Sequence, residues 1–373
     1  MGNESGTAQV TPLKQVAKLK KSPGFWHEAW KRFRKRKLAM VALIFVGFLA
    51  LVAILSPAIA GTRPVVCKYK GHIYFPCLGY FNPRWENPIF QRDGFRRRYV
   101  ENLPEKDPQS WAIWPLNFND PYRRVYDDEW PGRPANPTRD EGKPSSLNWF
   151  GTDQTGVDVF AQMVHGTRIA LLVGFVSMGI AAAIGIVVGA LAGYFGGWVD
   201  AVLSRIIEVV MCVPTLVLIL ALMAIIEQAT IWHLMAVIGV TSWTGIARLT
   251  RAEFLKLKET DFVAAARSLG VRQSRIIFRY ILPNALAPIL VPITFGIAAA
   301  ILVESGLSFL GFGAPPPNPS WGTLLSAGRS NYQLWWLILF PGMAIFLTVL
   351  AYNLIGEGLQ EATDPRLRDG GGH

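Results

Sequence analysis

The side chains that most often carry catalysis or metal binding are scattered along this chain. Its histidines show no His-Glu-x-x-His pattern, and the chain has no Gly-x-x-x-x-Gly-Lys-Ser/Thr loop. The first pattern would place two zinc ligands on one helix face, and the second would cradle nucleotide phosphates. The sequence therefore predicts no catalytic residues, no metal site and no bound cofactor on this chain, and we do not expect it to be an enzyme.

The most informative residues lie between two apolar segments in the second half of the chain. Asp261 is predicted to cap a short helix, because its carboxylate can accept hydrogen bonds from the free amides of the first turn. On that helix Phe262, Ala266 and Leu269 fall on one face. Gly270 is predicted to end the helix, since glycine tolerates the left-handed backbone that closes one. A short exposed helix of this kind is suited to fit a groove in a partner.

A second helix is predicted directly after this one, and the two form most of the loop 251–282. Leu282 and Pro283 lead from it into the next apolar segment. One side of the second helix is basic and carries Arg272, Arg275 and Arg279.

Three further residues are candidates for gating or for lining a pathway. Glu208 follows Arg205 by three residues, so a local ion pair and a gating role both remain open. Pro214 is predicted to kink its helix, either for packing or as a flexing point. Glu304 lies at the end of an apolar segment, and either lines a pathway or anchors a loop end.

The composition indicates the setting in which these residues act. The chain has 373 residues, of which 51% are hydrophobic and 17% charged, with a net charge of +11. Soluble domains carry about 25% charged residues, and here the apolar residues are gathered into long charge-free runs. A bilayer core needs roughly 20 apolar residues of helix. We therefore exclude a soluble globular protein and predict an all-α polytopic membrane protein.

Six transmembrane helices are predicted, at 38–60, 168–194, 206–226, 231–250, 283–303 and 334–356. The run 305–328 is rejected as a span and interpreted as a loop, re-entrant or not, because its prolines interrupt a helix. The first span ends in a sequence that resembles a signal-peptide cleavage site. At 23 residues it exceeds the length of a signal core, so a retained span is expected.

The basic residues predict the orientation of the spans. Residues 1–37 hold ten Lys and Arg and residues 248–282 hold eight, whereas 62–166 is nearly balanced. Positive charge marks cytoplasmic segments, so both termini are predicted to be cytoplasmic. The orientation of the spans accounts for the excess of positive charge, so no nucleic acid partner is expected. The predicted organisation is a basic segment with an interfacial helix (1–37), the first span (38–60), an extracytoplasmic insertion (61–166), a five-helix core (167–356) and a cytoplasmic tail (357–373).

The insertion is predicted to be a small ordered domain, because it is rich in aromatic residues, which disordered segments lack. The segments 65–69 and 72–75 flank Lys70 and Gly71 and are typical of a hairpin. Cys67 and Cys77 are either joined by a disulfide or two free thiols, and the sequence does not decide between them.

The loop 251–282 resembles the EAA loop of ABC-transporter permease subunits. In that family Glu-Ala-Ala is followed three residues later by Gly and, after about eleven more, by Leu-Pro. Ala264 stands where the family usually has Glu. If Asp261 caps the helix, that Glu would complete a capping box, and its absence predicts a less stable helix start. The matching residues are Ala265, Ala266, Gly270, Leu282 and Pro283.

Other matches resemble the dipeptide and oligopeptide permeases within this class. The long insertion resembles that of microcin C-type peptide uptake permeases, through the segment 69–76. The matches outside the insertion include Gly151-Thr152-Asp153, Glu304 with the segment 307–313, Ser320-Trp321-Gly322 and Asp364-Pro365-Arg366.

The resemblance implies a permease subunit of an ATP-driven peptide importer in the bacterial inner membrane. It further implies a second similar permease subunit, two ATP-binding subunits that carry ATP and magnesium and grip the helix 261–270, and a periplasmic or lipid-anchored peptide-binding protein. An importer of nickel or another small solute is the alternative within the class. An ion-coupled secondary carrier or a membrane-embedded enzyme is the rival, but we find no inverted repeat and no buried charge in mid-span that would favour a carrier.

Overall fold

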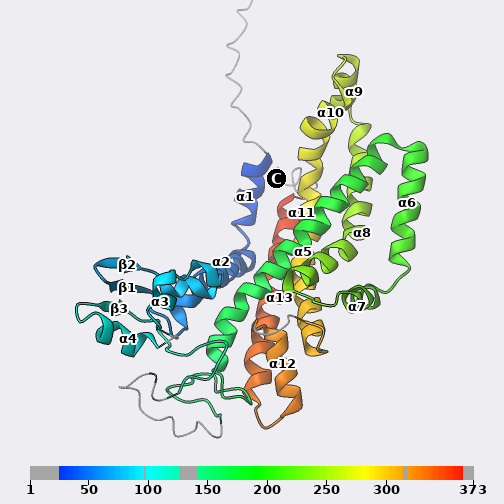
Figure 1. Cartoon of the computed structure of the whole chain (residues 1–373). Coiled ribbons are helices and arrows are strands. Elements are labelled where there is room, and N and C mark those ends of the chain that lie inside the picture. Colours follow the sequence, from blue (N-terminus) through cyan, green and yellow to red (C-terminus); the bar gives the residue numbers. More distant parts are fainter. Residues whose placement is uncertain (1–24, 96–97, 127–128, 130–141, 314–317, 364–373) are drawn as a thin grey trace, which may run out of the picture.

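A computed structural model of the chain describes residues 25–95, 98–126, 129, 142–313 and 318–363. The basic segment before residue 25, the prolines 315–317 and the match at 364–366 lie outside these residues. Long helices dominate, and one small domain with a sheet follows the first long helix (Figure 1). The helices outside that domain are α1 (Phe25–Phe33), α2 (Lys37–Ile59), α5 (Val159–Phe195), α6 (Gly197–Met211), α7 (Thr215–Ile225), α8 (Ile231–Lys258), α9 (Asp261–Ser268), α10 (Gln273–Arg275), α11 (Leu282–Phe309), α12 (Trp321–Ser330) and α13 (Trp336–Thr363).

Among the described residues, four helices are long and apolar enough to cross a membrane. They are α2, α5, α13 and the continuous segment Gln273–Phe309, which ends with α11. Each overlaps one of the predicted spans over most of its length. The predicted span 206–226 is wrong as a continuous helix, because α6 and α7 are bent by 83° where they meet. That pair counts as a fifth candidate only as one broken span, and α8 is not among the candidates, so six spans are not established.

The predicted loop over 305–328 is also wrong in part. α11 continues to Phe309, and α12 begins at Trp321. Ser320 and Thr323 start α12 with a reciprocal capping box. The Ser320 hydroxyl accepts from the Thr323 amide at 3.2 Å, and the Ser320 amide donates to the Thr323 hydroxyl at 3.0 Å. These two bonds satisfy amides that a helix start leaves free, so a helix forms directly after the proline-rich run.

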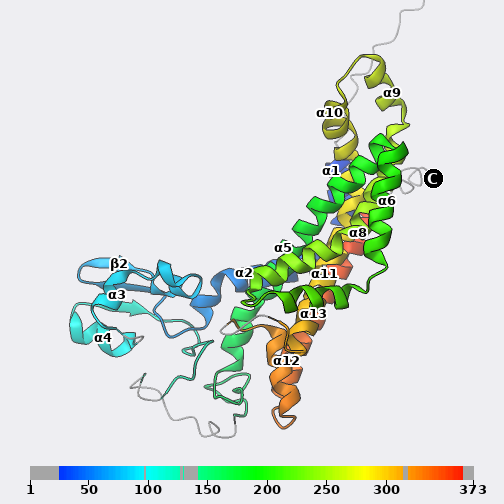
Figure 2. The same cartoon turned by 45° about the vertical axis from the view of Figure 1, so that its right-hand side comes forward.

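The helices α5 and α8 lie side by side and run in the same direction (Figure 2). Gly185, Gly189 and Gly193 of α5 are four residues apart and face α8. A Cβ added at Gly185 would lie 2.8 Å from the Trp243 carbonyl oxygen, and one at Gly193 would lie 2.6 Å from that of Arg251. Glycines at this spacing let two helix backbones approach closely, so the row holds α5 against α8.

The insertion has a three-stranded antiparallel sheet in the order β2–β1–β3. The hairpin of β1 and β2 is confirmed, and its turn residues Lys70 and Gly71 have φ of 48° and 82°, as a two-residue type I′ turn requires. The third strand was not predicted. The elements of the insertion are β1 (Val66–Tyr69), β2 (His72–Tyr74), β3 (Trp111–Ile113), the 3-10 turns η1 (Pro76–Tyr80) and η2 (Pro83–Trp85), and the short helices α3 (Pro88–Arg92) and α4 (Tyr99–Lys106).

The core of the insertion lies on one face of this sheet. Cys67 and Tyr69 of β1 are fully buried there against Phe90, Phe95 and Tyr99. The ring of Tyr69 meets that of Phe95 edge to face at 5.2 Å between centroids. The predicted small ordered domain is therefore present in the described part of the insertion.

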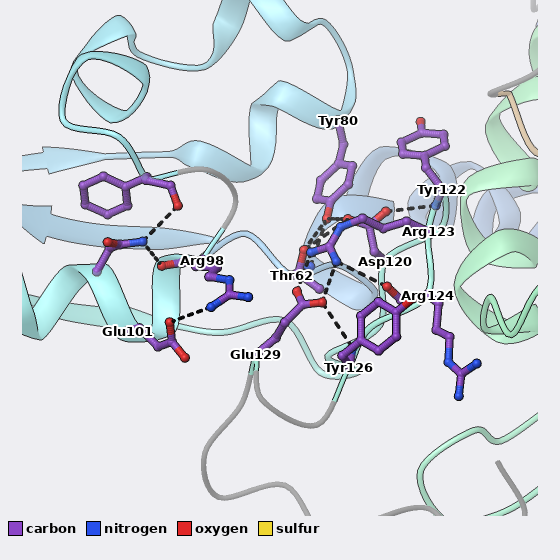
Figure 3. A network of polar contacts seen from close by, with 12 residues as sticks. Thr62, Tyr80, Arg98, Glu101, Asp120, Tyr122, Arg123, Arg124, Tyr126 and Glu129 are labelled. Carbon is purple, nitrogen blue, oxygen red and sulfur yellow. Dashed lines mark hydrogen bonds and ion pairs between the residues drawn. The ribbon is translucent and has the colours of Figure 1, made fainter.

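A buried polar network joins the insertion to the end of α2 (Figure 3). The Asp120 carboxylate accepts hydrogen bonds from the Tyr80 hydroxyl at 2.9 Å and from the Thr62 hydroxyl at 3.1 Å. The Arg123 guanidinium lies beside Asp120 and forms a bidentate pair with Glu129, at 2.6 and 2.7 Å. Because the three partners of Asp120 come from separate segments, this network fixes the insertion against the point where the chain leaves α2.

Both ends of the described chain lie toward the same end of the helix bundle as α9, and α12 lies toward the other (Figure 1). The predicted interfacial helix is α1. Its Phe33 is buried with Ala39 of α2 and Ala362 of α13, whereas Trp26 and Trp30 are about half exposed. The first and last described helices are thus packed together.

Candidate coupling site

The predicted helix of the loop 251–282 is α9, but it begins one residue later than the capping prediction requires. Thr260 occupies the cap position and makes no side-chain capping bond, and Asp261 is the first helical residue. Asp261 as N-cap is therefore wrong. Its carboxylate stands in the first turn, where negative charge complements the helix dipole. Val263 holds the third helical position, so the capping-box argument about Ala264 does not hold either.

The end of α9 is as predicted. Gly270 has φ of 71°, in the left-handed region. Its amide donates to the Arg267 carbonyl at 2.9 Å, and the next amide, of Val271, donates to the Ala266 carbonyl at 3.1 Å. These two bonds form a Schellman motif, which satisfies carbonyls that a helix end leaves free. A Cβ at Gly270 would meet nothing within 4 Å, so only backbone conformation requires glycine here.

Of the three residues that helical spacing placed on one face of α9, Phe262 and Leu269 are exposed, whereas Ala266 is buried. Val263 and Ala266 are buried at 0% and 5% exposure, and they belong to the main apolar cluster. Phe262 and Leu269 are exposed at 43% and 83%, with Ala265 exposed between them. We call Phe262, Ala265 and Leu269 the coupling face. It is an apolar surface on a helix whose opposite side is already packed.

Two contacts attach α9 and its neighbours to the transmembrane helices. The Arg267 guanidinium of α9 lies over the ring of Tyr194 at the end of α5, 5.8 Å from its centroid. At the end of α8, Arg251 forms a bidentate pair with Asp200 of α6, and its Nη2 lies 2.7 Å from Oδ2. Neither contact was predicted. The Arg251 and Asp200 positions are 51 residues apart, so no local spacing signals the pair.

The predicted second helix is only partly α-helical. α10 covers Gln273–Arg275, and the π-helical segment η4 covers Ile276–Ile281. The Leu282 amide donates five residues back, to the Ile277 carbonyl. Pro283 follows within the first turn of α11 and has no amide to donate. The Asn284 side chain donates to the Tyr280 carbonyl at 2.6 Å.

The three gating candidates lie in different surroundings. Glu208 pairs with Arg205 within α6 at 2.6 Å, and both side chains are exposed. Pro214 immediately precedes α7, at the break between α6 and α7. The structure thus places Glu208 in the local ion pair and Pro214 at a bend. Their roles in gating stay predictions.

Glu304 is the most buried of these candidates, at 1% exposure. Its carboxylate accepts from the Ser308 hydroxyl at 2.7 Å, and the Ser320 hydroxyl donates to that of Ser308 at 3.3 Å. Glu304 thereby links α11 to the cap of α12. This position agrees with the anchoring alternative, and the pathway role stays a prediction.

Cys67 and Cys77 are both buried and free, so the structure contains the free-thiol alternative and no disulfide between them. The Cys77 thiol donates to the Val65 carbonyl at 3.4 Å. Burial, together with the nearby Cys77, raises the pKa of the Cys67 thiol to about 12. Among the described residues, no group of three or more His, Cys, Asp and Glu side chains is placed to hold a metal ion.

Comparison with known proteins identifies the class. The family described as "Binding-protein-dependent transport system inner membrane component" matches residues 185–369, and that described as "N-terminal TM domain of oligopeptide transport permease C" matches residues 24–70. Together they cover α1 and α2, the C-terminal end of α5, and the chain from α6 to α13 with the coupling loop. They define a multi-pass permease of the bacterial inner membrane.

Individual relatives are similar along nearly the whole chain. The dipeptide transport permease DppC of Alkalihalophilus pseudofirmus is 33% identical over 344 residues, covering 92% of this chain and 90% of that protein. The permease YejE of Escherichia coli is 34% identical, covering 90% and 96%, and the oligopeptide permease OppC of Bacillus subtilis is 31% identical, covering 94% and 92%. The chain belongs to the dipeptide and oligopeptide family of ABC-transporter permeases.

Proposed function

We propose that the chain is one permease subunit of an ATP-driven importer that carries peptides across the bacterial inner membrane. The relatives named for dipeptide and oligopeptide transport support peptides as the cargo and favour them over nickel. A second, similar permease subunit completes the pathway, and a periplasmic or lipid-anchored protein delivers the peptide. ATP and magnesium bind to separate ATPase subunits, so this chain performs no covalent chemistry itself.

The six-span topology is part of the proposal. α5 and α8 run parallel, so the chain between them has to return across the same depth. The bent pair α6–α7 makes that return, and α8 then crosses beside α5 as the fourth span. The basic loop 248–282 and both termini lie on the cytoplasmic side, where positive charge is retained.

The bend between α6 and α7 suits contact with the second permease subunit. Residues 211–217, around Pro214, are all exposed in this single chain. The residues there are mainly apolar, and they include Met211, Val213 and Leu216. In the transporter these side chains cover the other subunit or line the pathway between the two.

The coupling face carries the mechanism. It presents apolar side chains on one side of α9, while Val263 and Ala266 hold the other side against the core. A groove on an ATPase subunit receives Phe262 and Leu269. When ATP draws the two ATPases together, the displacement of α9 passes to α5 through the Arg267 contact with Tyr194. The spans then reorient between outward and inward access.

The Leu269→Ala variant tests this assignment. Leu269 is 83% exposed, so its truncation should leave the fold intact. Burying a leucine side chain against a partner stabilises by about 1.5–3 kcal/mol, so its loss should weaken ATPase docking by about tenfold to a hundredfold. ATP-driven peptide uptake by the reconstituted transporter should fall accordingly.

Ser268→Ala is the matched control, because Ser268 is exposed on the same helix and its hydroxyl donates to the Ala264 carbonyl of that helix, at 3.2 Å. It should leave docking and uptake unchanged. Wild-type uptake and wild-type ATPase affinity in Leu269→Ala would refute the coupling role of this face.

A further inference from the structure

A polar cavity lies at the end of the bundle opposite the coupling helix, which is the extracytoplasmic end in the proposed topology. It is formed between the loop that enters α5 and the turn from α12 to α13, and its volume is about 450 Å³. Sites for small molecules are typically of this size. Polar side chains make up most of its wall, among them Gln154, Thr155, Ser330 and Asn331. The cavity is separate from the coupling face, and its chemistry follows from two charged residues.

The first charged residue of the cavity is Arg124, which has no ion-pair partner among the described residues. The nearby carboxylates of Asp120 and Glu129 pair with the neighbouring Arg123 instead, and no described carboxylate oxygen lies within 4.0 Å of the Arg124 guanidinium. The Nε of Arg124 is buried and has no hydrogen-bond partner in the described part of the chain. Figure 3 shows this side chain pointing away from the network around Asp120. Its positive charge is therefore available to a ligand.

Two contacts hold Arg124 at the wall of the cavity. Its guanidinium carbon lies 5.5 Å from the centroid of the Tyr126 ring, a cation–π contact that uses none of the N–H donors. The stem of Arg124 passes close to Gly156, where an added Cβ would lie 2.9 Å from the Arg124 Cδ. The φ of Gly156 is 81°, so glycine is required there for the backbone as well. The donors of Arg124 are thus positioned without being occupied.

The second charged residue of the cavity is Asp153, on the loop that enters α5. Its Oδ1 accepts from the amides of Thr155 and Val157 at 2.8 and 3.0 Å, and its Oδ2 accepts from the Gln162 side chain at 2.7 Å. These donors are neutral, so they fix the carboxylate without cancelling its charge. No described Lys or Arg nitrogen lies within 4.0 Å of it. Arg124 and Asp153 therefore line one cavity without pairing with each other.

The cavity continues into a second one of about 590 Å³, which shares Asp153, Thr155 and Ser330 with the first. The wall of the second cavity includes Ser308, whose hydroxyl donates to the buried Glu304 carboxylate at 2.7 Å. A ligand that extends past Asp153 thus has further room, on the side where the carboxylates lie. The positive end of the combined groove is at Arg124.

We propose that this groove binds the incoming peptide by its two charged ends. The C-terminal carboxylate accepts hydrogen bonds from Nε and one Nη of Arg124, the bidentate geometry in which arginine holds carboxylates. The N-terminal ammonium lies on the side of Asp153, and the uncharged polar side chains between them bond to the peptide backbone. A short peptide with free ends carries both charges, so the site selects for the ends rather than for particular side chains. This inference rests on the proposed function, which takes peptides as the cargo and places the groove outside.

Binding of radiolabelled trialanine to the complete transporter in lipid nanodiscs, with the binding protein left out, tests the groove. Amidation of the peptide C-terminus should weaken binding by about tenfold to a hundredfold, as expected for the loss of hydrogen bonds to a charged group. Arg124→Gln should weaken binding of the free acid by a similar factor and remove the difference between acid and amide. Acetylation of the peptide N-terminus should weaken binding equally in wild type and in Arg124→Gln, because it acts at the other end.

Arg98→Gln is the matched control. Arg98 belongs to the same insertion, pairs with Glu101 at 3.6 Å and does not line the cavity. This variant should bind the acid and the amide as the wild type does.

Equal binding of acid and amide to the wild type would overturn the proposal, and so would the absence of trialanine binding. Loss of both forms alike in Arg124→Gln would show that this residue supports the fold instead of holding the carboxylate. If Arg124→Gln weakens docking of the binding protein and leaves the preference for the acid unchanged, the carboxylate at Arg124 belongs to that protein, and the proposal fails. Each of these outcomes leaves the proposed function standing. That function fails separately if the wild-type transporter with its binding protein shows no ATP-driven peptide uptake.

Discussion

The glycine row between α5 and α8 makes a quantitative prediction through the Gly189→Ala variant. The added Cβ would lie 2.6 Å from the Thr250 Cβ and 3.0 Å from the Arg251 amide nitrogen, and it would also strike the Ala247 carbonyl. Ordinary contact starts at 3.4 Å, so the helices must part by about 1 Å at this point to clear the Ala247 carbonyl. Overpacking of this kind costs about 1–3 kcal/mol.

Gly179→Ala is the control on the same helix, since a Cβ there meets nothing within 4 Å. Alanine in place of glycine favours a helix by about 1 kcal/mol at both positions, so the difference between the variants isolates the contact with α8. The midpoint of thermal unfolding of the lipid-reconstituted chain should be lower for Gly189→Ala than for Gly179→Ala, by a difference equivalent to about 1–3 kcal/mol. Equal midpoints would refute the account of α5 and α8 as a glycine-locked pair.

Three other features of the structure make predictions that are simpler to test. Gly270→Val should reduce ATP-driven uptake, because a left-handed backbone costs residues other than glycine about 1–2 kcal/mol. Asparagine tolerates that backbone, so uptake by Gly270→Asn should stay near wild type. Equal uptake by the two variants would contradict the role of the Schellman motif. Cys67 and Cys77 should resist alkylation in the folded chain and react after denaturation without reductant, as mass spectrometry can establish; a linked peptide pair would show a disulfide instead. Burial raises the pKa of Glu129, but hydrogen bonds from Arg123 and the Tyr126 amide outweigh it and hold that pKa below its usual range. The stability that Glu129 contributes is therefore present above its ordinary pKa of 4.5 and lost as the pH falls through the lower folded value, and Glu129→Gln should weaken this acid sensitivity in unfolding measurements.

The proposed topology has a direct test. A reporter fused near Ser110, just before β3, should be active only outside the cytoplasm, because the insertion is extracytoplasmic in the six-span arrangement. Fusions within the loop 251–282 should show the opposite activity. Cytoplasmic activity at 110 would overturn the topology.

The long elements were predictable because their signal is cumulative. Charge-free runs of about 20 residues, a length set by bilayer thickness, located α2, α5, α11 and α13. Gly270 indicated the end of α9, because glycine adopts the left-handed backbone there without steric cost. The family followed from the spacing of residues in the same loop.

The remaining features depend on tertiary contacts between segments that are distant in the sequence. Pro214 predicted a bend, but its 83° angle depends on how α6 and α7 pack against the rest of the bundle. Helical spacing grouped Ala266 with Phe262 and Leu269, and spacing alone cannot show that Ala266 and Val263 face the core. The Arg251–Asp200 pair and the Arg267–Tyr194 contact join residues far apart in the chain, so no local pattern signals them. The four-residue spacing of the glycine row is visible in the sequence, but spacing alone does not identify α8 as the helix that the row faces.

The length of α5 gives the contact at its C-terminal end a mechanical consequence. At about 1.5 Å per residue, its 37 residues form a rod of roughly 55 Å, and α8 packs along the C-terminal half of it. A rod of that length tilted by only about 5° about one end displaces its other end by roughly 5 Å. If α5 pivots near its end at Tyr194, a small displacement of α9 therefore becomes a larger displacement at the other end of α5, beside the insertion.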